Sequence, residues 1–352
     1  MYGDIAIYDV SPQEARGFSK KVAELLGVSY NDYPDLVTKF KDGETDIKIK
    51  DSVRGKDVFV FQSYIPPIGE RLYELELFLD AAKAGGAANR VTVVMPYCLG
   101  QRGERRTRAR QPVPVLTIAR NLKTNGADKI LTVGIHAAAV GSIFNACGLG
   151  FEYLEDEYLV ANYIIQRKLH DSTIATPDVG AAKRARKIKE IVIQNSPPEF
   201  TVHIAIADKY RPQPDKAEIT EAVGNVKDRP VFIVDDIAST LNSIASAVEA
   251  YKNKGAREAY IIITHPVLVE GHEKALKKLC DDGFVKEIVF GNTKPVSGLA
   301  AENRKIKYLP FEPFVAEAIR RINKDVSISG LHKYSQIISV YQNARQSKIT
   351  LD

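Results

Sequence analysis

The sequence predicts an α/β fold of two similar domains, each a mostly parallel sheet flanked by helices, and three observations support this. First, short runs rich in Val, Ile, Phe and Leu recur along the 352 residues, as expected for strands buried on both faces. Second, helical stretches separate these runs, which is typical of a parallel sheet. Third, similar strand–helix–strand segments recur at an offset of about 170 residues. The expected strands cover residues 5–8, 58–61, 91–95, 130–133, 173–175, 202–206, 231–234, 259–263 and 286–290.

The first expected helix follows the first strand. Ser11, Pro12 and Glu14 form a capping-box pattern with proline at the first helical position. We therefore expect this helix to begin directly after Ser11.

The repeat indicates an internal duplication. The segment 54–63 resembles the segment 228–236, and each is followed by a helix and a small-residue turn into another strand. Chance resemblance between two generic strand–helix units is the alternative. One difference matters: where the later copy carries Asp235 and Asp236, the earlier one carries Gln62 and Ser63. We therefore expect only the later copy to have kept the chemistry, with domains at 1–155 and 156–330 and a tail at 331–352.

Composition excludes several classes of protein. The chain is 45% hydrophobic and 26% charged, which is ordinary for a globular protein, and no long apolar stretch predicts a membrane span. A net charge of +5 is mild for this length, so it suits small anions better than nucleic acid. Three distant cysteines without a Cys-x-x-Cys pattern fit a reducing compartment and argue against zinc. We expect a cytoplasmic protein with neither nucleic-acid nor membrane partners.

The segment 231–243 carries the clearest chemical signal. An apolar strand ends in Asp235 and Asp236, and a polar turn then opens a helix. Backbone N–H groups at a helix start favour an anion. Adjacent carboxylates at the carboxyl end of a strand are well placed to bind two neighbouring hydroxyls or a metal ion. An ordinary N-cap and loop is the alternative.

Three further segments suit phosphate chemistry. Residues 102–110 hold five arginines, whose guanidinium groups suit a polyphosphate; a nucleic-acid patch or a solvated loop are the alternatives. Lys209 and Arg211 follow a buried strand and precede an expected mobile loop, so they could close over a transferring phosphoryl group, although such pairs are common on surfaces. His136 and Asp178 each follow a strand, where they could share a hydrated Mg²⁺ or be merely structural.

Taken together, these segments resemble the ribose-phosphate diphosphokinase (phosphoribosyl pyrophosphate synthetase) family over roughly residues 4–330. The resemblance implies two phosphoribosyltransferase-like domains, the first contacting ATP and other subunits and the second carrying the ribose-phosphate loop and a catalytic lid. The matching segments are 39–44, 96–112, 136–137, 176–178, 208–211, 235–243 and 316–321.

The resemblance also implies residue roles. Phe40 would stack on adenine across a subunit interface, and Arg102 would grip the triphosphate. The implied ATP contacts are Phe40, Asp42, Glu44, Arg102, Glu104 and Arg105. The implied Mg²⁺ ligands are His136 and Asp178, and the implied catalytic residues are Lys209 and Arg211. The implied ribose-phosphate contacts are Asp235, Asp236, Ser239, Thr240, Asn242 and Ser243. A homo-oligomer, from dimer to hexamer, is implied because the ATP site is shared between subunits.

The chain departs from the family pattern near the acceptor. Ser239 replaces an acid, Asn242 a glycine and Ser243 a threonine, while Gly103 and Gly134 replace a glutamine and an aspartate. Because asparagine tolerates positive φ, we expect Asn242 to preserve the glycine's backbone conformation.

The implied reaction transfers the β,γ-diphosphate of MgATP to the 1-hydroxyl of a 5-phosphorylated ribose and releases AMP. Ribose 5-phosphate is the first candidate acceptor, and ADP-ribose is the alternative that a smaller, less acidic loop would admit. A noncatalytic regulatory subunit of an active homologue and a plain phosphoribosyltransferase are the other hypotheses.

Overall fold

The computed structural model describes residues 3–213 and 216–346, which form two compact units. Unit 1 consists of residues 3–155, 293–295 and 311–346, and unit 2 consists of residues 156–213, 216–292 and 296–310. Neither unit is continuous in the chain, whereas the sequence predicts continuous domains; the predicted domain limits stay a prediction.

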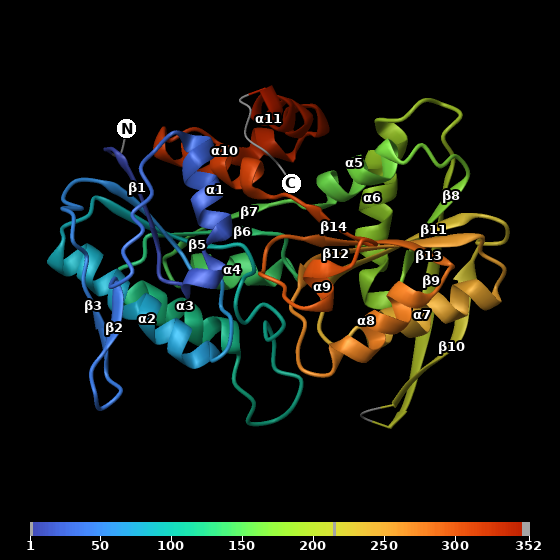
Figure 1. Cartoon of the computed structure of the whole chain (residues 1–352), viewed down its shortest axis with the longest axis horizontal. Coiled ribbons are helices and arrows are strands. Elements are labelled where there is room, and N and C mark those ends of the chain that lie inside the picture. The colour runs from blue at the N-terminus through green and yellow to red at the C-terminus, as the bar shows by residue number, and fades with distance from the viewer. Residues whose placement is uncertain (1–2, 214–215, 347–352) are drawn as a thin grey trace. The chain divides into compact units, whose positions relative to one another are not determined.

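Unit 1 is built on a parallel five-stranded sheet in the order β1-β4-β5-β6-β7. Its strands are Ile5–Asp9, Asp57–Phe61, Arg90–Met95, Lys129–Val133 and Gly150–Leu154. A separate antiparallel hairpin pairs β2 (Val37–Lys39) with β3 (Thr45–Ile47). The helices are α1 (Gly17–Leu26), α2 (Ile68–Asp80), α3 (Pro114–Thr124), α4 (Ala139–Ala146), α10 (Glu312–Asn323) and α11 (Tyr334–Gln346). Figure 1 shows α1 and α10 on one side of this sheet and α2 and α3 on the other.

Unit 2 is built on a seven-stranded sheet in the order β10-β9-β8-β11-β12-β13-β14, parallel except for the β9–β10 pair. In that spatial order its strands are Lys216–Gly224, Val202–Gln213, Ser172–Thr176, Pro230–Ala238, Glu258–Pro266, Val285–Gly291 and Ile306–Leu309. Helices α5 (Glu157–Gln166) and α6 (Ala182–Gln194) pack together. Helices α7 (Asn242–Asn253) and α8 (His272–Asp281) share one apolar core with the sheet, and α9 is the short helix Leu299–Glu302.

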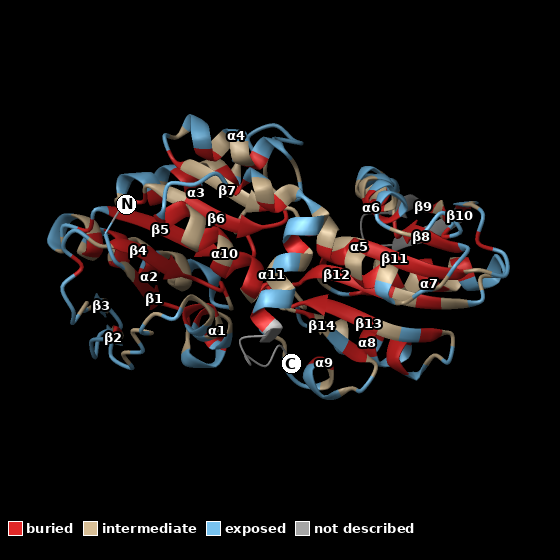
Figure 2. Ribbon diagram, turned by 90° about the horizontal axis from the view of Figure 1, so that it is seen from above, coloured by how far each residue is buried: buried red, intermediate tan, exposed pale blue. Residues whose placement is uncertain are grey.

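The predicted fold class is confirmed: both sheets are mostly parallel and flanked by helices. Each of the nine expected strands is present, and Figure 2 shows the central strands as buried. Five strands were not predicted from the sequence, namely β2, β3, β7, β10 and β14. No helix within the described ranges is both long and apolar enough to cross a membrane.

Two local expectations were wrong. The capping box does not form, because Ser11 does not cap a helix: a 3₁₀ turn (Gln13–Ala15) intervenes and α1 begins at Gly17. The Ser11 hydroxyl instead accepts a hydrogen bond from the Ser63 N–H at 2.8 Å, since the strand ends meet there. The second expectation was a mobile loop directly after Arg211. Residues 212 and 213 instead belong to β9, which pairs with β10.

Candidate active site

An acidic cluster lies at the carboxyl ends of β8 and β11 in unit 2. These strands are parallel neighbours, with Ile233 opposite Ala175, so Asp235 and Asp236 on β11 come close to Asp178, which follows β8. Burial, together with the charges of Asp236 and Asp178, raises the pKa of Asp235 to about 8. Three carboxylates therefore converge, which is unfavourable unless a cation or hydroxyl donors join them.

The backbone around the acids is held by local hydrogen bonds. The Asp178 carboxylate accepts the Ala181 N–H at 3.3 Å, and the Thr176 hydroxyl donates to the Asp178 carbonyl at 2.8 Å. The Asp235 carboxylate accepts the N–H of Asp236 at 3.0 Å. Asp178 is thus held in a fixed turn, and Asp235 and Asp236 lie on a strand rather than in a free loop.

The turn after β11 differs from the expectation for Asn242. The residue with positive φ is Leu241 (63°), while Asn242 is the first residue of α7. The left-handed region costs a non-glycine residue roughly 1–2 kcal/mol, and the Leu241 side chain, which is 2% exposed, offsets this by burial. Ser239, Thr240 and Ser243 remain at least partly accessible around the start of α7. Backbone N–H groups at a helix start and nearby hydroxyls suit a phosphate.

A buried arginine, Arg184, acts electrostatically on the acidic cluster. Arg184 on α6 forms an ion pair with Asp156 and donates to the Thr264 hydroxyl at 2.8 Å. The charge of Asp236 also acts on this guanidinium, so Arg184 balances part of the acidic cluster. Nothing in the sequence signalled this group, because Asp156 and Thr264 lie 28 and 80 positions away from Arg184.

The arginine-rich segment lies in unit 1, in the loop between β5 and α3. Its five arginines, 102, 105, 106, 108 and 110, are all exposed, as is His136 after β6. Gln101 joins the two regions: its side chain is buried and accepts the His136 N–H at 2.9 Å. The structure therefore brings the predicted triphosphate ligand Arg102 and the predicted metal ligand His136 onto one edge of unit 1. Glu104 forms an ion pair with Arg105 at 3.4 Å.

The tip of the β2–β3 hairpin carries the predicted adenine contacts. Phe40 is 58% exposed, although a large aromatic side chain normally seeks burial. The turn is closed by the Phe40 N–H donating to the Glu44 carbonyl at 2.9 Å and by the Glu44 N–H donating to the Asp42 carboxylate at 3.1 Å. The three predicted residues are thus presented together on a stiff turn.

The remaining predicted residues are not all brought together. Lys209 and Arg211 lie on β9, but their side chains fall outside the described part of the structure. His136 belongs to unit 1 and Asp178 to unit 2, so each is placed only within its own unit. Among the described residues, no group of three His, Cys, Asp or Glu side chains is arranged to enclose a metal ion.

The donor set nevertheless fits Mg²⁺. This ion prefers oxygen ligands, keeps several waters, and is usually held by one or two carboxylates together with substrate phosphates. Asp178, Asp235 and Asp236 supply such oxygens. Besides burial, the charges of Asp236 and Asp178 act on Asp235, and a divalent cation would balance this negative charge.

Comparison with known proteins assigns the family. Two family models match: the N-terminal domain of ribose phosphate pyrophosphokinase over residues 9–126, and the phosphoribosyl synthetase-associated domain over residues 179–333. The ribose-phosphate pyrophosphokinase of Clostridium acetobutylicum is 35% identical over 88% of this chain and 92% of its own length. The chain belongs to the ribose-phosphate pyrophosphokinase family. The Bacillus subtilis member is 32% identical over 94% of this chain and 98% of its own.

A solved structure agrees with this assignment. The crystal structure of phosphoribosylpyrophosphate synthetase from Mycobacterium smegmatis superposes with a TM-score of 0.78 and 26% identity, covering 92% of this chain and 99% of that one. This ribose-phosphate pyrophosphokinase family member is therefore an enzyme of the diphosphotransferase type with two phosphoribosyltransferase-like domains. Helix α11 begins after residue 333, where the second family model ends.

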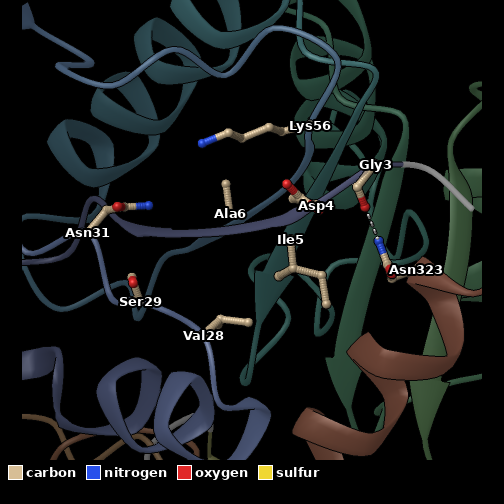
Figure 3. Close-up of a pocket in the computed structure, with 9 residues that line it drawn as sticks. All are labelled: Gly3, Asp4, Ile5, Ala6, Val28, Ser29, Asn31, Lys56 and Asn323. Atoms are coloured by element: carbon tan, nitrogen blue, oxygen red, sulfur yellow. Dashed lines mark hydrogen bonds between the residues drawn. The ribbon is translucent and has the colours of Figure 1, made fainter.

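A hollow of about 460 Å³ lies elsewhere on unit 1, beside the start of β1 (Figure 3). Its lining includes Gly3, Asp4 and Lys56, which precede β1 and β4, and therefore lies at the amino ends of these strands. The predicted site residues of the sheets follow carboxyl ends instead, and none of the predicted residues lines the hollow. It is not part of the candidate active site.

Proposed function

We propose that this enzyme transfers the β,γ-diphosphate of MgATP to the 1-hydroxyl of ribose 5-phosphate. The ribose O1 forms a bond to the β-phosphorus, the bond from that phosphorus to the α,β-bridging oxygen breaks, AMP leaves with that oxygen, and the hydroxyl proton is released. The product is phosphoribosyl pyrophosphate. The convergence of Asp178, Asp235 and Asp236 carries the proposal, together with the names of the relatives.

The acceptor side follows from the chemistry of unit 2. Asp235 and Asp236 would accept hydrogen bonds from the 2- and 3-hydroxyls of the ribose and so orient O1 for attack. Hydroxyls and backbone N–H groups of the turn Ser239–Ser243 would bind the 5-phosphate. Substituting either acid should therefore weaken binding of the sugar more than binding of ATP.

The donor side uses unit 1 and the hairpin. Arg102 would contact the triphosphate, with Glu104 and Arg105 beside it, and Phe40 would stack on adenine with Asp42 and Glu44 near its amino group. Bound Mg²⁺, with His136 and Asp178 as its protein ligands, would neutralise charge on the phosphates. Lys209 and Arg211 would stabilise the charge that develops during transfer.

A direct assay tests this function. The protein is incubated with MgATP and either ribose 5-phosphate or ADP-ribose, and AMP and product mass are followed. We expect AMP and a diphosphorylated ribose 5-phosphate; diphosphorylation of ADP-ribose alone would overturn the proposed acceptor. The other alternative, a noncatalytic regulatory subunit, predicts no AMP with either sugar. Neither alternative gains support from the names of the relatives.

A matched pair of variants tests the acid cluster. Asp236→Asn should raise the KM for ribose 5-phosphate about 10- to 100-fold, as expected for losing a hydrogen bond to a charged group. Asp281→Asn removes an exposed carboxylate of the same unit, on α8, and should change neither KM. Equal effects of the two substitutions would contradict the assigned role of Asp236.

We also propose a homo-oligomer, between dimer and hexamer, located in the cytoplasm. The exposed Phe40 supports the first, since an adenine site shared between subunits needs an accessible aromatic ring. The three unpaired thiols support the second. Measuring the mass of the protein in solution tests the assembly: an active monomer would contradict the role given to Phe40.

A further inference from the structure

Among the described residues of unit 1, one lysine, Lys294, is buried without a carboxylate partner. It belongs to residues 293–295, which pack in unit 1 although the chain on both sides belongs to unit 2. Its side chain is only slightly accessible, and within the described residues it forms no ion pair. Since an unpaired buried charge is unfavourable, an apolar residue would serve stability better at this position.

Three contacts hold the ammonium group. Lys294 Nζ donates to the Tyr64 carbonyl at 2.5 Å and to the Ser63 carbonyl at 3.3 Å. It also lies 5.4 Å from the centre of the Tyr97 ring, within the range of a cation–π interaction. The charge is therefore stabilised by two backbone dipoles and one aromatic face.

The groups that Lys294 contacts are themselves constrained. Tyr64 is buried and adopts a positive φ of 46°, which is strained for a bulky residue, in the turn directly after β4. Tyr97 is also buried and begins the loop that carries Arg102 five residues later. The same ammonium thus bridges the strained turn and the start of the arginine-rich segment.

We propose that Lys294 is a positioning residue for the ATP site. Its ammonium group fixes the Ser63–Tyr64 turn and the Tyr97 ring, and thereby the start of the segment 102–110. This inference rests on the proposed function, in which Arg102 contacts the triphosphate of ATP. Lys294 itself touches no substrate.

The ammonium makes this positioning sensitive to pH. Burial lowers the pKa of Lys294 to about 8. The titratable groups around it are Tyr64, Tyr97 and Cys98, with Glu76 acting on Tyr64. Burial raises the pKa of Cys98 to about 12 and that of Tyr64 well above its usual value. Below about pH 8 the three contacts are intact, and as pH rises through this value the neutral amine loses its hold on the ring.

The test compares two substitutions with a control in the full-length protein. Lys294→Met removes the charge and keeps the length, whereas Lys294→Arg keeps a charge at every pH. Lys305→Met is the control, because Lys305 also donates to a carbonyl, that of Asp282 at 2.8 Å, but in unit 2. The dissociation constant of MgATP, the KM values and kcat are measured between pH 6.5 and 9.5, with far-UV circular dichroism to check folding.

We expect wild-type affinity for MgATP to fall about tenfold as pH rises through about 8. Lys294→Met should show the weaker affinity at all pH values, and Lys294→Arg should recover much of it and remove the inflection; Lys305→Met should match the wild type. The KM for ribose 5-phosphate should stay within about twofold throughout. Wild-type affinity in Lys294→Met, or an inflection that persists in Lys294→Arg, would overturn the inference.

Two readouts keep other failures apart. Because MgATP binding is measured without an acceptor, the inference stands or falls even when neither sugar reacts, an outcome that would refute only the proposed function. If Lys294→Met fails to fold, the test rests on how MgATP affinity depends on pH in the wild type and in Lys294→Arg. A wild-type affinity that does not change with pH would then refute the inference.

Discussion

A buried ion pair in unit 1 gives the sharpest prediction about stability. Arg90, at the start of β5, donates through Nε and Nη2 to Asp57 of β4 at 2.9 and 2.5 Å. The same guanidinium donates to the Ile322 carbonyl at 2.8 Å, and Asn323 donates to Asp57 and to the Gly3 carbonyl, both at 3.0 Å. Figure 3 shows this last bond, which joins the end of α10 to the start of the chain.

Replacing Arg90 with methionine should destabilise unit 1 strongly. Asp57 is fully buried, so the substitution leaves a carboxylate whose one remaining side-chain donor within the described residues is the Asn323 amide. Removing one partner of a buried pair costs about 3–5 kcal/mol. With about 2–4 °C of melting temperature per kcal/mol for a unit of this size, Arg90→Met should melt roughly 6–20 °C below the wild type.

Thermal melting followed by circular dichroism measures this loss, and a second substitution tests its cause. Adding Asp57→Asn to Arg90→Met removes the stranded charge, so the double variant should recover part of the lost stability. Lys277→Met, which breaks the exposed pair with Asp281, should leave the melting temperature close to that of the wild type. If Arg90→Met melted within 2 °C of the wild type, or the two substitutions in unit 1 were additive, the reasoning would be refuted.

Three further predictions concern single sites. Burial raises the pKa of Asp9 to about 6, above its value in the unfolded chain, so protonated Asp9 stabilises the fold fully below pH 4. As pH rises from 4 through 6, the free energy of unfolding should fall by about 3 kcal/mol. Asp9→Asn should remove this pH dependence when the free energy of unfolding is measured by denaturant titration. Leu241→Gly relieves a strained φ but removes a buried side chain worth more, so it should lower stability by about 1–3 kcal/mol, and a more stable variant would show that strain dominates. Gly103→Gln, which introduces the residue typical of the family, places a Cβ 2.7 Å from the Pro114 ring, so the KM for MgATP should rise, whereas an unchanged KM would show that the loop adapts.

The strands that sequence reasoning missed have a common physical cause. Of the five, β7, β10 and β14 are edge strands of their sheets. An edge strand that is only partly buried needs no continuous apolar run; β7 reads Gly-Phe-Glu-Tyr-Leu and is mostly half-buried. The pair β2 and β3 forms a hairpin outside both sheets, with three residues in each strand. Apolar runs therefore identify the buried strands, the edge strand β1 among them, and miss edge strands such as β7 that are only partly buried.

The candidate site was predictable where local sequence carries the chemistry. Asp235 and Asp236 end an apolar run, and parallel strands end at one edge, so their approach to Asp178 follows from topology. Gln101 and Arg184 could not be predicted in the same way, because their partners lie 35 and 28 positions away. The positive φ of Leu241 could not be predicted from the sequence either, because it depends on the burial of that side chain in the folded unit.

The two copies of the strand–turn–helix element use the position at the end of the strand for different purposes. In unit 1 the Gln62 amide donates to the Arg71 carbonyl at 3.0 Å, its oxygen accepts the Tyr64 N–H at 3.2 Å, and the Ser63 N–H is bound by Ser11. In unit 2 the matching positions hold two carboxylates beside a third, and burial together with these neighbouring charges raises the pKa of Asp235. Hydrogen bonds that close on the protein itself stabilise a fold, whereas like charges gathered at a strand end oppose it unless a ligand completes them. The position therefore serves stability in unit 1, whereas in unit 2 it gathers negative charge that a ligand would complete.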